Sequence, residues 1–451
     1  MSEQIRAGFG RADITPEEFG PMGGFGNDNY RICTNVYDHL FGTVIAITDA
    51  SDSTVLLISC DMLHTNNQQT AICRQTITAA TGIPGDKIMI AATHTHSGPS
   101  INGDSEFTEN YYHFLAEKLS IAAQDALADS RPATIEIARG IAKNMTFDRH
   151  YFNDKGEYVG NGAGQPLESL AAHVAIPDEQ MQFIRFLREG ARDILLMNWQ
   201  AHVTFVGGPE TDTNMSADYV GVLRDQIEGR TGCRFAFFQG ACGNLTPGSK
   251  MTYEQPYTRT LNPRKRYIPY GKMLADMALQ AIENMTEVKA GPVKTQRLQY
   301  QAVVDHTDDY RLENANLYWN KYYEWTPEER KEYAQKFGFR GRLHAGAIKN
   351  RAKAGQLQPM ELNVVTVGDI SFATAPYEMF CSNGMYIKEN TPFEMTCVMG
   401  YCNGSFSYLA DKQEFQYGDA CYEVFTRRYV EGTAEDIVEN HVRMLNELKE
   451  A

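Results

Sequence analysis

Two histidines one residue apart follow an apolar, strand-like run of this sequence. His94 and His96 lie in the stretch Ala91–Ser100 (AATHTHSGPS), directly after the run that begins at Lys87. Residues i and i+2 of an extended segment point to the same side, so both imidazoles are expected to face one pocket. Strand ends of this kind are favoured places for sites in α/β proteins. Metal ligation and acid–base chemistry are both compatible with the pair, and a solvated strand end explains the spacing equally well.

A third histidine strengthens the metal interpretation. His202 closes a second apolar run, which begins at Asp193, so two strands each end at a histidine. A hydrolytic zinc site takes three or four nitrogen or oxygen ligands and keeps one position open for water. Glu378 and Asp61 each follow an apolar strand and are the carboxylate candidates, although capping a helix or facing solvent is the more frequent role of such acids.

The elements that must position these residues follow from the periodicity of the chain. Strands are predicted in ten short runs rich in β-branched and aromatic residues: Thr43–Thr48, Thr54–Ser59, Lys87–Ala92, Thr134–Ala138, Gln182–Leu187, Asp193–Trp199, Arg234–Phe238, Leu362–Val367, Ile370–Ala373 and Met395–Met399. Helices are predicted at about Gln68–Ala80, Glu109–Ala128, Ala217–Glu228, Gly271–Asn284 and Ala434–Leu448. This alternation predicts an α/β fold, and strands that follow one another without a helix predict mixed rather than parallel sheets.

No repeat or linker marks a boundary, so residues 1–451 are expected to form a single large catalytic domain. One segment differs from the rest. Residues 305–356 are charged and aromatic, and Thr326-Pro327-Glu328-Glu329 supplies the cap, the proline and the glutamate of a helix start. We interpret this segment as a helical excursion, either a surface hairpin without a role at the site or a lid over it.

The composition limits the classes of molecule that this protein is expected to bind. The formal charge of −15 argues against nucleic acid and against an anionic membrane surface. The chain shows no apolar run of membrane-spanning length, no export signal and no glycine pattern for a nucleotide cofactor. Nine scattered cysteines without a CxxC pair indicate a reducing, cytoplasmic location. A small-molecule substrate is therefore expected, and the sequence leaves homo-oligomer formation open.

Several motifs together resemble the neutral/alkaline, non-lysosomal ceramidase family, whose members are zinc-dependent hydrolases of N-acyl amides. The similarity covers most of the chain, and its most specific part is the THTHSGP stretch. The motifs follow the family's order: Ala7–Pro16 (AGFGRADITP), Ala92–Pro99 (ATHTHSGP), Ala201–Thr204 (AHVT), Met215–Tyr219 (MSADY), Phe238–Pro247 (FQGACGNLTP), Gly400–Tyr408 (GYCNGSFSY) and Tyr422–Glu423.

The resemblance implies a ligand set and a set of catalytic groups. The zinc ligands would be His94, His202, Glu378 and Tyr408. Imidazole and carboxylate are ordinary zinc ligands, and a phenolate is a rarer one that the cation stabilises. Three further residues would then act on the substrate, by orienting water or by stabilising charge on the carbonyl oxygen: His96, Arg149 and Tyr422.

The sequence also departs from the family pattern. Asn244 stands where relatives usually carry an aspartate, which leaves the role of that acid in doubt. The chain ends soon after Tyr408, so no C-terminal immunoglobulin-like domain is expected. The resemblance thus implies a cytoplasmic zinc hydrolase that uses metal-activated water to cleave an amide bond of a small soluble substrate. The alternatives are a metal-dependent lactonase or esterase, and a non-catalytic metal-binding homologue.

Overall fold

The predicted mixed α/β class is confirmed. The computed structural model describes residues 4–25, 31–103, 105–162, 164–207, 213–249, 251 and 264–451. Its main sheet has the order β13-β11-β10-β6-β1-β3-β4-β5, with β15 paired to β6. Among the described strands of this sheet, only the pairs β11–β13 and β4–β5 are parallel. The strands are β1 (Ile5–Asp13), β3 (Phe41–Thr48), β4 (Thr54–Cys60), β5 (Ile88–Ala92), β6 (Arg131–Ile141), β10 (Gln180–Arg188), β11 (Ile194–Trp199), β13 (Arg234–Gln239) and β15 (Thr286–Val288).

A second, four-stranded sheet packs against the main sheet. It consists of β16 (Val293–Val303), β17 (Leu357–Val367), β18 (Ile370–Thr374) and β20 (Met395–Met399), with β18 and β20 parallel. Alternate residues of both sheets, such as Ile45, Leu57 and Phe372, form the core between them. The intervening residues, such as Val44 and Ile58, pack on the opposite face. Strands buried on both faces read as continuous apolar runs, which is why they could be predicted from the sequence.

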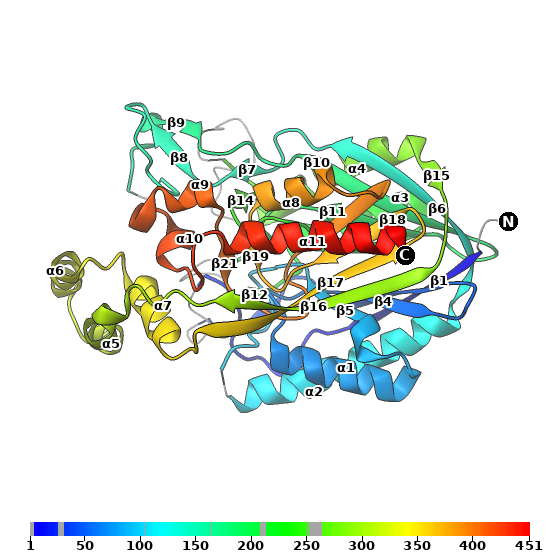
Figure 1. Cartoon of the computed structure of the whole chain (residues 1–451), viewed down its shortest axis with the longest axis horizontal. Helices are drawn as coiled ribbons and strands as arrows, with labels where there is room; N and C mark the ends of the chain where they lie inside the picture. Colours follow the sequence, from blue (N-terminus) through cyan, green and yellow to red (C-terminus); the bar gives the residue numbers. More distant parts are fainter. Residues whose placement is uncertain are drawn as a thin grey trace.

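Helices cover both outer faces, so the architecture has four layers (Figure 1). The outer face of the main sheet is covered by α1 (Asn67–Thr81), α2 (Glu106–Ala128), α3 (Tyr219–Thr231) and α4 (Arg264–Ala281). The outer face of the second sheet is covered by α8 (Cys381–Glu389) and α11 (Thr433–Glu450). Each predicted helix is present within a few residues, except that α4 begins seven residues before the predicted start. In the described part of the chain, no helix has the length and hydropathy needed to cross a membrane.

Three helices form a separate group at the end of the molecule opposite the N-terminus (Figure 1). They are α5 (Leu312–Lys321), α6 (Pro327–Phe337) and α7 (Arg342–Ala352), and they share a small apolar core around Tyr318 and Ile348. The predicted helix start at Thr326 is confirmed: its side chain caps α6 while Glu329 hydrogen-bonds back to the Thr326 backbone. The segment predicted as a helical excursion therefore does contain helices.

Short elements gather where the sheets end. They are β2 (Asn35–Val36), β7 (Phe147–Asp148), β8 (Tyr151–Asn153), β9 (Leu170–His173), β12 (Asn214–Met215), β14 (Leu245–Thr246), β19 (Glu378–Met379), β21 (Tyr408–Leu409), α9 (Lys412–Phe415) and α10 (Tyr422–Phe425). Glu378 itself lies in β19, and α8 begins only at Cys381. These short pairs hold the candidate site.

Candidate active site

The seven residues to which the resemblance assigns ligation or catalysis line one cavity of about 840 Å³. The cavity lies beyond the carboxyl ends of β5 and β11, which is where the sequence placed it. The seven residues come from six separate segments of the chain: His94 and His96, Arg149, His202, Glu378, Tyr408, and Tyr422. Their functional roles stay predictions, but the fold brings every one of them to the same cavity.

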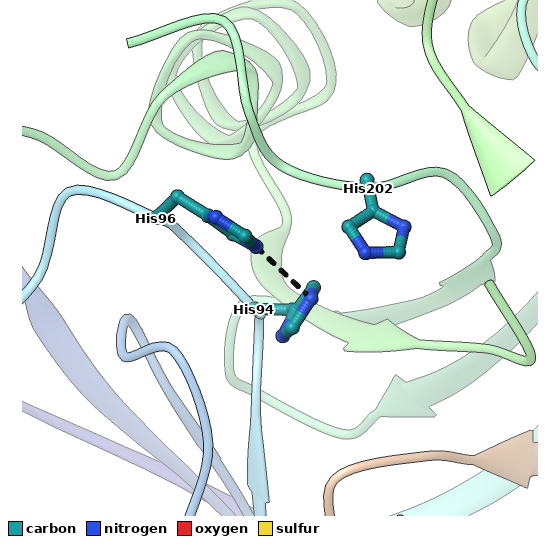
Figure 2. Close-up of side chains that lie close together, drawn as sticks. All are labelled: His94, His96 and His202. Atoms are coloured by element: carbon teal, nitrogen blue, oxygen red, sulfur yellow. Dashed lines mark hydrogen bonds between the residues drawn. The ribbon is translucent and has the colours of Figure 1, made fainter. Parts of the chain in front are cut away.

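The conformation of His94 differs from the expected one. Its backbone has a φ of 69°, in the left-handed region, so the strand has ended before the histidine pair. The alternation of an extended strand is therefore not what brings the two rings together. They nevertheless face each other, with ring centroids 4.8 Å apart and 3.2 Å between their Nε2 atoms (Figure 2). Both rings face one pocket, as predicted, but the reason given for it, an extended strand, is wrong.

The tautomer of His94 is fixed by the backbone. Its Nδ1 lies 2.7 Å from the carbonyl oxygen of Leu63. A carbonyl can only accept, so Nδ1 carries the proton and Nε2 presents its lone pair to the cavity. The side chain is buried, and burial lowers the pKa of His94 well below its usual range, which favours the neutral ring.

His202 is held in the same way from the opposite side. Its Nδ1 lies 2.8 Å from the carbonyl oxygens of both Cys242 and Leu245, so Nδ1 carries a proton and Nε2 is the nitrogen that faces the cavity. Burial lowers the pKa of His202, but Cys242 and Glu378 outweigh burial and raise it to about 9, so Nε2 holds a proton that a bound cation would displace. A bridge between Thr95 and Val203 ties the two histidine-bearing loops together. Figure 2 shows the three imidazoles converging from these two loops.

Glu378 completes this group. Its Oε2 lies 3.5 Å from the Nε2 atoms of both His94 and His202, and it accepts a hydrogen bond of 3.3 Å from the hydroxyl of Tyr401. Burial raises the pKa of Glu378, but the neighbouring imidazoles outweigh burial and lower it to about 2. The carboxylate is therefore ionised at neutral pH. Tyr408 is brought beside it by the parallel pairing of β19 and β21.

These donors fit a divalent cation such as zinc. The ligand nitrogens of His94, His96 and His202 all lie within 4.8 Å of one another. Nε2 of His202 is buried, and within the described part of the chain it makes no hydrogen bond. Two imidazole nitrogens that face one carboxylate, on rings whose other nitrogen contacts a backbone carbonyl, form the usual arrangement around a protein-bound zinc ion. Glu378 lies within 4 Å of His94 and His202, and His96 belongs to the same group of nitrogens, so its non-ligand role stays a prediction.

Arg149 and Tyr422 lie on the neighbouring wall. The Arg149 guanidinium packs 5.0 Å from the ring centre of Tyr408 and 5.8 Å from that of Tyr422, and it forms an ion pair with the buried Glu423. Burial lowers the pKa of Arg149, but Glu423 and Tyr408 outweigh it and raise it above its usual value. A fixed cation and a phenol thus line the cavity beside Tyr408.

Sequence reasoning missed the buried network behind Arg149. Nε2 of His150 lies 2.9 Å from Glu423, and its Nδ1 lies 3.3 Å from Glu414, to which the hydroxyl of Tyr158 also donates. Burial lowers the pKa of His150, but the two carboxylates outweigh it and raise the pKa to about 10. The carboxylates of Glu414 and Glu423 are thereby balanced by the cations of His150 and Arg149. The sequence signal that could have indicated this network is the charged run Asp148-Arg149-His150, which directly follows the buried Phe147.

The other two sequence candidates have structural partners. Asp61 forms a buried ion pair with Arg224, at 2.7 Å, and does not line the cavity. Asn244 accepts a hydrogen bond of 2.9 Å from the backbone of Cys381 and donates one of 3.3 Å to Asp148. Its own carbonyl accepts from the N–H of Arg149 at 2.9 Å. An amide is the side chain that can both donate and accept here, so this departure from the family pattern has a local reason.

Known structures with this arrangement of layers identify the fold. The whole chain superposes on three quarters (75%) of neutral ceramidase from Pseudomonas aeruginosa, with a TM-score of 0.73 and 18% identity. A structure described as a ceramidase complexed with C2 matches 99% of this chain and 76% of its own, with a TM-score of 0.70 and 17% identity. The chain has the fold of these ceramidases. The resemblance predicted from the motifs is thus confirmed at the level of the fold.

No protein-family model matches the chain, and no curated protein sequence matches it either.

The helical segment α5–α7 reaches the candidate site. Leu343, in α7, lines the cavity, and the neighbouring His344 packs against Phe425 of α10 with ring centroids 5.2 Å apart. The lid hypothesis for residues 305–356 remains a prediction.

Proposed function

We propose that this protein is a zinc-dependent hydrolase that cleaves the amide bond of a small soluble N-acyl substrate. The observation that carries the proposal is the pair of imidazole nitrogens, Nε2 of His94 and of His202, that both face the carboxylate of Glu378 at 3.5 Å. The ceramidase fold supports the same chemistry by analogy. A cavity of about 840 Å³ is large enough for a drug-sized molecule.

His94, His202, Glu378 and Tyr408 would hold the zinc ion. When bound, zinc would supply a Lewis acid that activates a water molecule and polarises the scissile carbonyl. The carbonyls of Leu63 and Cys242 keep the two imidazoles in the tautomer that this ligation needs. Tyr408 presents its phenol beside Glu378 through the strand pairing.

The remaining residues would act on the substrate. Arg149 and Tyr422 stand where they can donate to the carbonyl oxygen as negative charge develops on it. His96 would accept the proton that the attacking water loses and pass it to the departing amine, because an amide anion is too poor a leaving group. No serine nucleophile is needed. The Glu423 carboxylate fixes the guanidinium of Arg149 from behind.

We also propose a reducing, cytoplasmic location. All nine cysteines are buried and unpaired. A protein of an oxidising compartment would be expected to pair some of them as disulfides. The formal charge of −15, which argues against an anionic membrane surface and for a small-molecule substrate, supports the same proposal.

Two measurements test the function. Elemental analysis of the purified protein should find about one zinc per chain; a folded protein that binds no metal would overturn the proposal. A panel of N-acyl amides, esters and lactones, followed by pH-stat, should show turnover of amides. Turnover of lactones or esters alone would reassign the bond, and metal binding without turnover of any substrate would indicate a binding protein.

Two variants separate the roles of neighbouring histidines. His94→Ala should lose both zinc and turnover, whereas His96→Ala should retain zinc and lose turnover by about 100-fold or more. His113→Ala, which changes an exposed histidine on α2, is the matched control and should retain both. Loss of zinc from His96→Ala would instead make His96 a ligand.

A further inference from the structure

A buried tyrosine that the proposed mechanism does not use lies behind the candidate site. The side chain of Tyr401 is buried, and it does not belong to the lining of the cavity. Its ring stacks on the imidazole of His94, with ring centroids 3.9 Å apart and planes inclined by 21°. Its hydroxyl donates a hydrogen bond of 3.3 Å to Oε2 of Glu378. One side chain thus contacts two of the four proposed ligands without reaching the substrate.

The hydrogen bond goes to the carboxylate oxygen that faces the imidazoles. Oε2 of Glu378 is the atom that lies 3.5 Å from Nε2 of both His94 and His202. A carboxylate oxygen has two lone pairs, so a hydrogen bond to one of them leaves the other available to a cation. The hydroxyl of Tyr401 therefore restricts how the carboxylate can turn within the site.

The hydroxyl of Tyr401 is itself held in place. Sγ of Cys242 lies 3.1 Å from the phenol oxygen, and Nε2 of Gln239 donates a hydrogen bond of 2.8 Å to the same sulfur. Both of these side chains are fully buried. The backbone carbonyl of Cys242 also contacts Nδ1 of His202, at 2.8 Å. The hydroxyl is thus connected, directly or through Cys242, to Glu378 and to His202, while the ring supports His94.

The backbone at Tyr401 adopts a conformation that large side chains rarely take. Its φ is 55°, in the left-handed region. The carbonyl of Tyr401 accepts hydrogen bonds from the N–H of Ala92, at 3.2 Å, and from the hydroxyl of Thr65, at 3.3 Å. Ala92 ends β5, two residues before His94, so this loop is tied to the segment that carries the histidines. Strain of this kind collects at functional sites, and a glycine would avoid it, so the side chain is what this position supplies.

We propose that Tyr401 is a positioning residue of the cation site, which holds Glu378 and His94 in the orientation that binds zinc and so increases the affinity for the ion. This inference rests on the proposed zinc-dependent function and adds a residue outside the ligand set that the family resemblance implies. Tyr401 contacts the ligands rather than the ion. Loss of such a partner behind a metal ligand typically weakens metal binding 10- to 100-fold.

The test removes the hydroxyl and keeps the stacked ring. Wild type and Tyr401→Phe are freed of metal with a chelator, and zinc is then titrated in competition with a chromophoric chelator of known affinity. We expect the zinc Kd of Tyr401→Phe to be about 10- to 100-fold higher than that of wild type. Circular dichroism and urea unfolding of the metal-free proteins check that the variant is folded.

Tyr377→Phe is the matched control. Tyr377 directly precedes Glu378 and is as deeply buried as Tyr401. Its hydroxyl makes no hydrogen bond within the described part of the chain, and its side chain packs in the core of the second sheet. Removing this hydroxyl should leave the zinc Kd unchanged. Equal weakening of zinc binding in both variants would indicate a general effect of losing a buried hydroxyl and would contradict the proposal.

Cobalt(II) provides a readout that a purely structural role would not change. Its visible absorption depends on the ligands around the ion and on their arrangement. The cobalt complex of Tyr401→Phe should have a different spectrum from that of wild type, because the carboxylate of Glu378 is free to turn. The complex of Tyr377→Phe should have the wild-type spectrum. Identical spectra for all three proteins would show that the hydroxyl of Tyr401 does not position Glu378.

The same titrations separate this inference from the function on which it rests. A folded wild-type protein that binds neither zinc nor cobalt would overturn the proposed function and, with it, the role of Tyr401. Zinc binding that is equally tight in wild type and in folded Tyr401→Phe would overturn the positioning role alone. The site formed by the four proposed ligands would then stand without it.

Discussion

Glu378 and Tyr408 lie directly opposite each other in the parallel pairing of β19 and β21. Paired residues of neighbouring strands project on the same side, so the backbone itself sets the carboxylate beside the phenol. Arg149 packs against the other face of this arrangement, 5.0 Å from the centre of the Tyr408 ring. Two of the four proposed zinc ligands are therefore positioned by one short strand pair, although they are distant in the sequence.

Tyr408→Phe should separate the chemistry from the fold. The ring and the strand pairing remain, so the free energy of unfolding should change by no more than about 1.5 kcal/mol. The lost phenol oxygen should lower kcat/KM by about 100-fold or more and weaken zinc retention on dialysis. Tyr386→Phe removes a hydroxyl from a largely exposed tyrosine of α8 and serves as the control. Wild-type turnover by Tyr408→Phe would remove this residue from the site.

The buried pairing of His150 with Glu414 and Glu423 makes stability depend on pH. The folded-state pKa of about 10 lies above the ordinary value of 6.5. A raised pKa means that the stabilisation is fully present below about pH 6.5 and is lost as pH rises through about 10. Urea unfolding at pH 6.5 and 9.5 should therefore show a loss of stability on the order of a few kcal/mol.

His150→Gln isolates this contribution. The amide fills similar space but does not titrate, so the variant should be less stable than wild type at pH 6.5 and nearer to it at pH 9.5. Groups other than His150 titrate equally in both proteins and cancel in the comparison. A constant difference between the two proteins across this range would show that His150 is neutral in the folded state.

Most of the layered fold could be predicted from local patterns. Runs such as Thr54–Ser59 are apolar throughout because both of their faces are buried, one against the second sheet and one against helices. The capping box at Thr326 was recognisable because its hydrogen bonds connect residues three positions apart. By contrast, β16 has alternating burial and many polar residues, so it carried little apolar signal.

The site could be predicted only with the help of the family resemblance. Spacing suggested that His94 and His96 share a pocket, but the left-handed conformation of His94 means that spacing alone was an unsound reason. Tyr408 has no local signal, because its place beside Glu378 depends on a long-range strand pair. The same is true of Glu414, which meets His150 only in the folded chain.

Leu343 offers a test of the helical segment as part of the site. It lines the cavity from α7 although 38% of its surface is exposed. Leu343→Ala removes apolar contact with a bound substrate, so KM should rise about 3- to 10-fold with kcat nearly unchanged. Leu317→Ala, at a similarly exposed position on α5, is the matched control. Identical KM values in the two variants would leave residues 305–356 as a surface hairpin.

Asn244→Asp tests why an amide replaces the acid that is usual in the family. The new carboxylate would stand about 3.3 Å from Oδ1 of Asp148, to which the Asn244 amide now donates. Burial already raises the pKa of Asp148 to about 6, so ionisation of Asp148 costs stability as pH rises toward neutrality. A second carboxylate should add to this cost, by about 1–3 kcal/mol at pH 8.

The sign of the pH dependence distinguishes repulsion from a simple loss of packing. At pH 5 the pair can share a proton, so Asn244→Asp should be nearly as stable as wild type and should weaken progressively toward pH 8. Asn244→Ala loses the hydrogen bonds at every pH and should be destabilised equally at both. Asn446→Asp, on the exposed face of α11, should show no such difference. If Asn244→Asp were equally stable at pH 5 and pH 8, Asp148 would not be the reason for the amide.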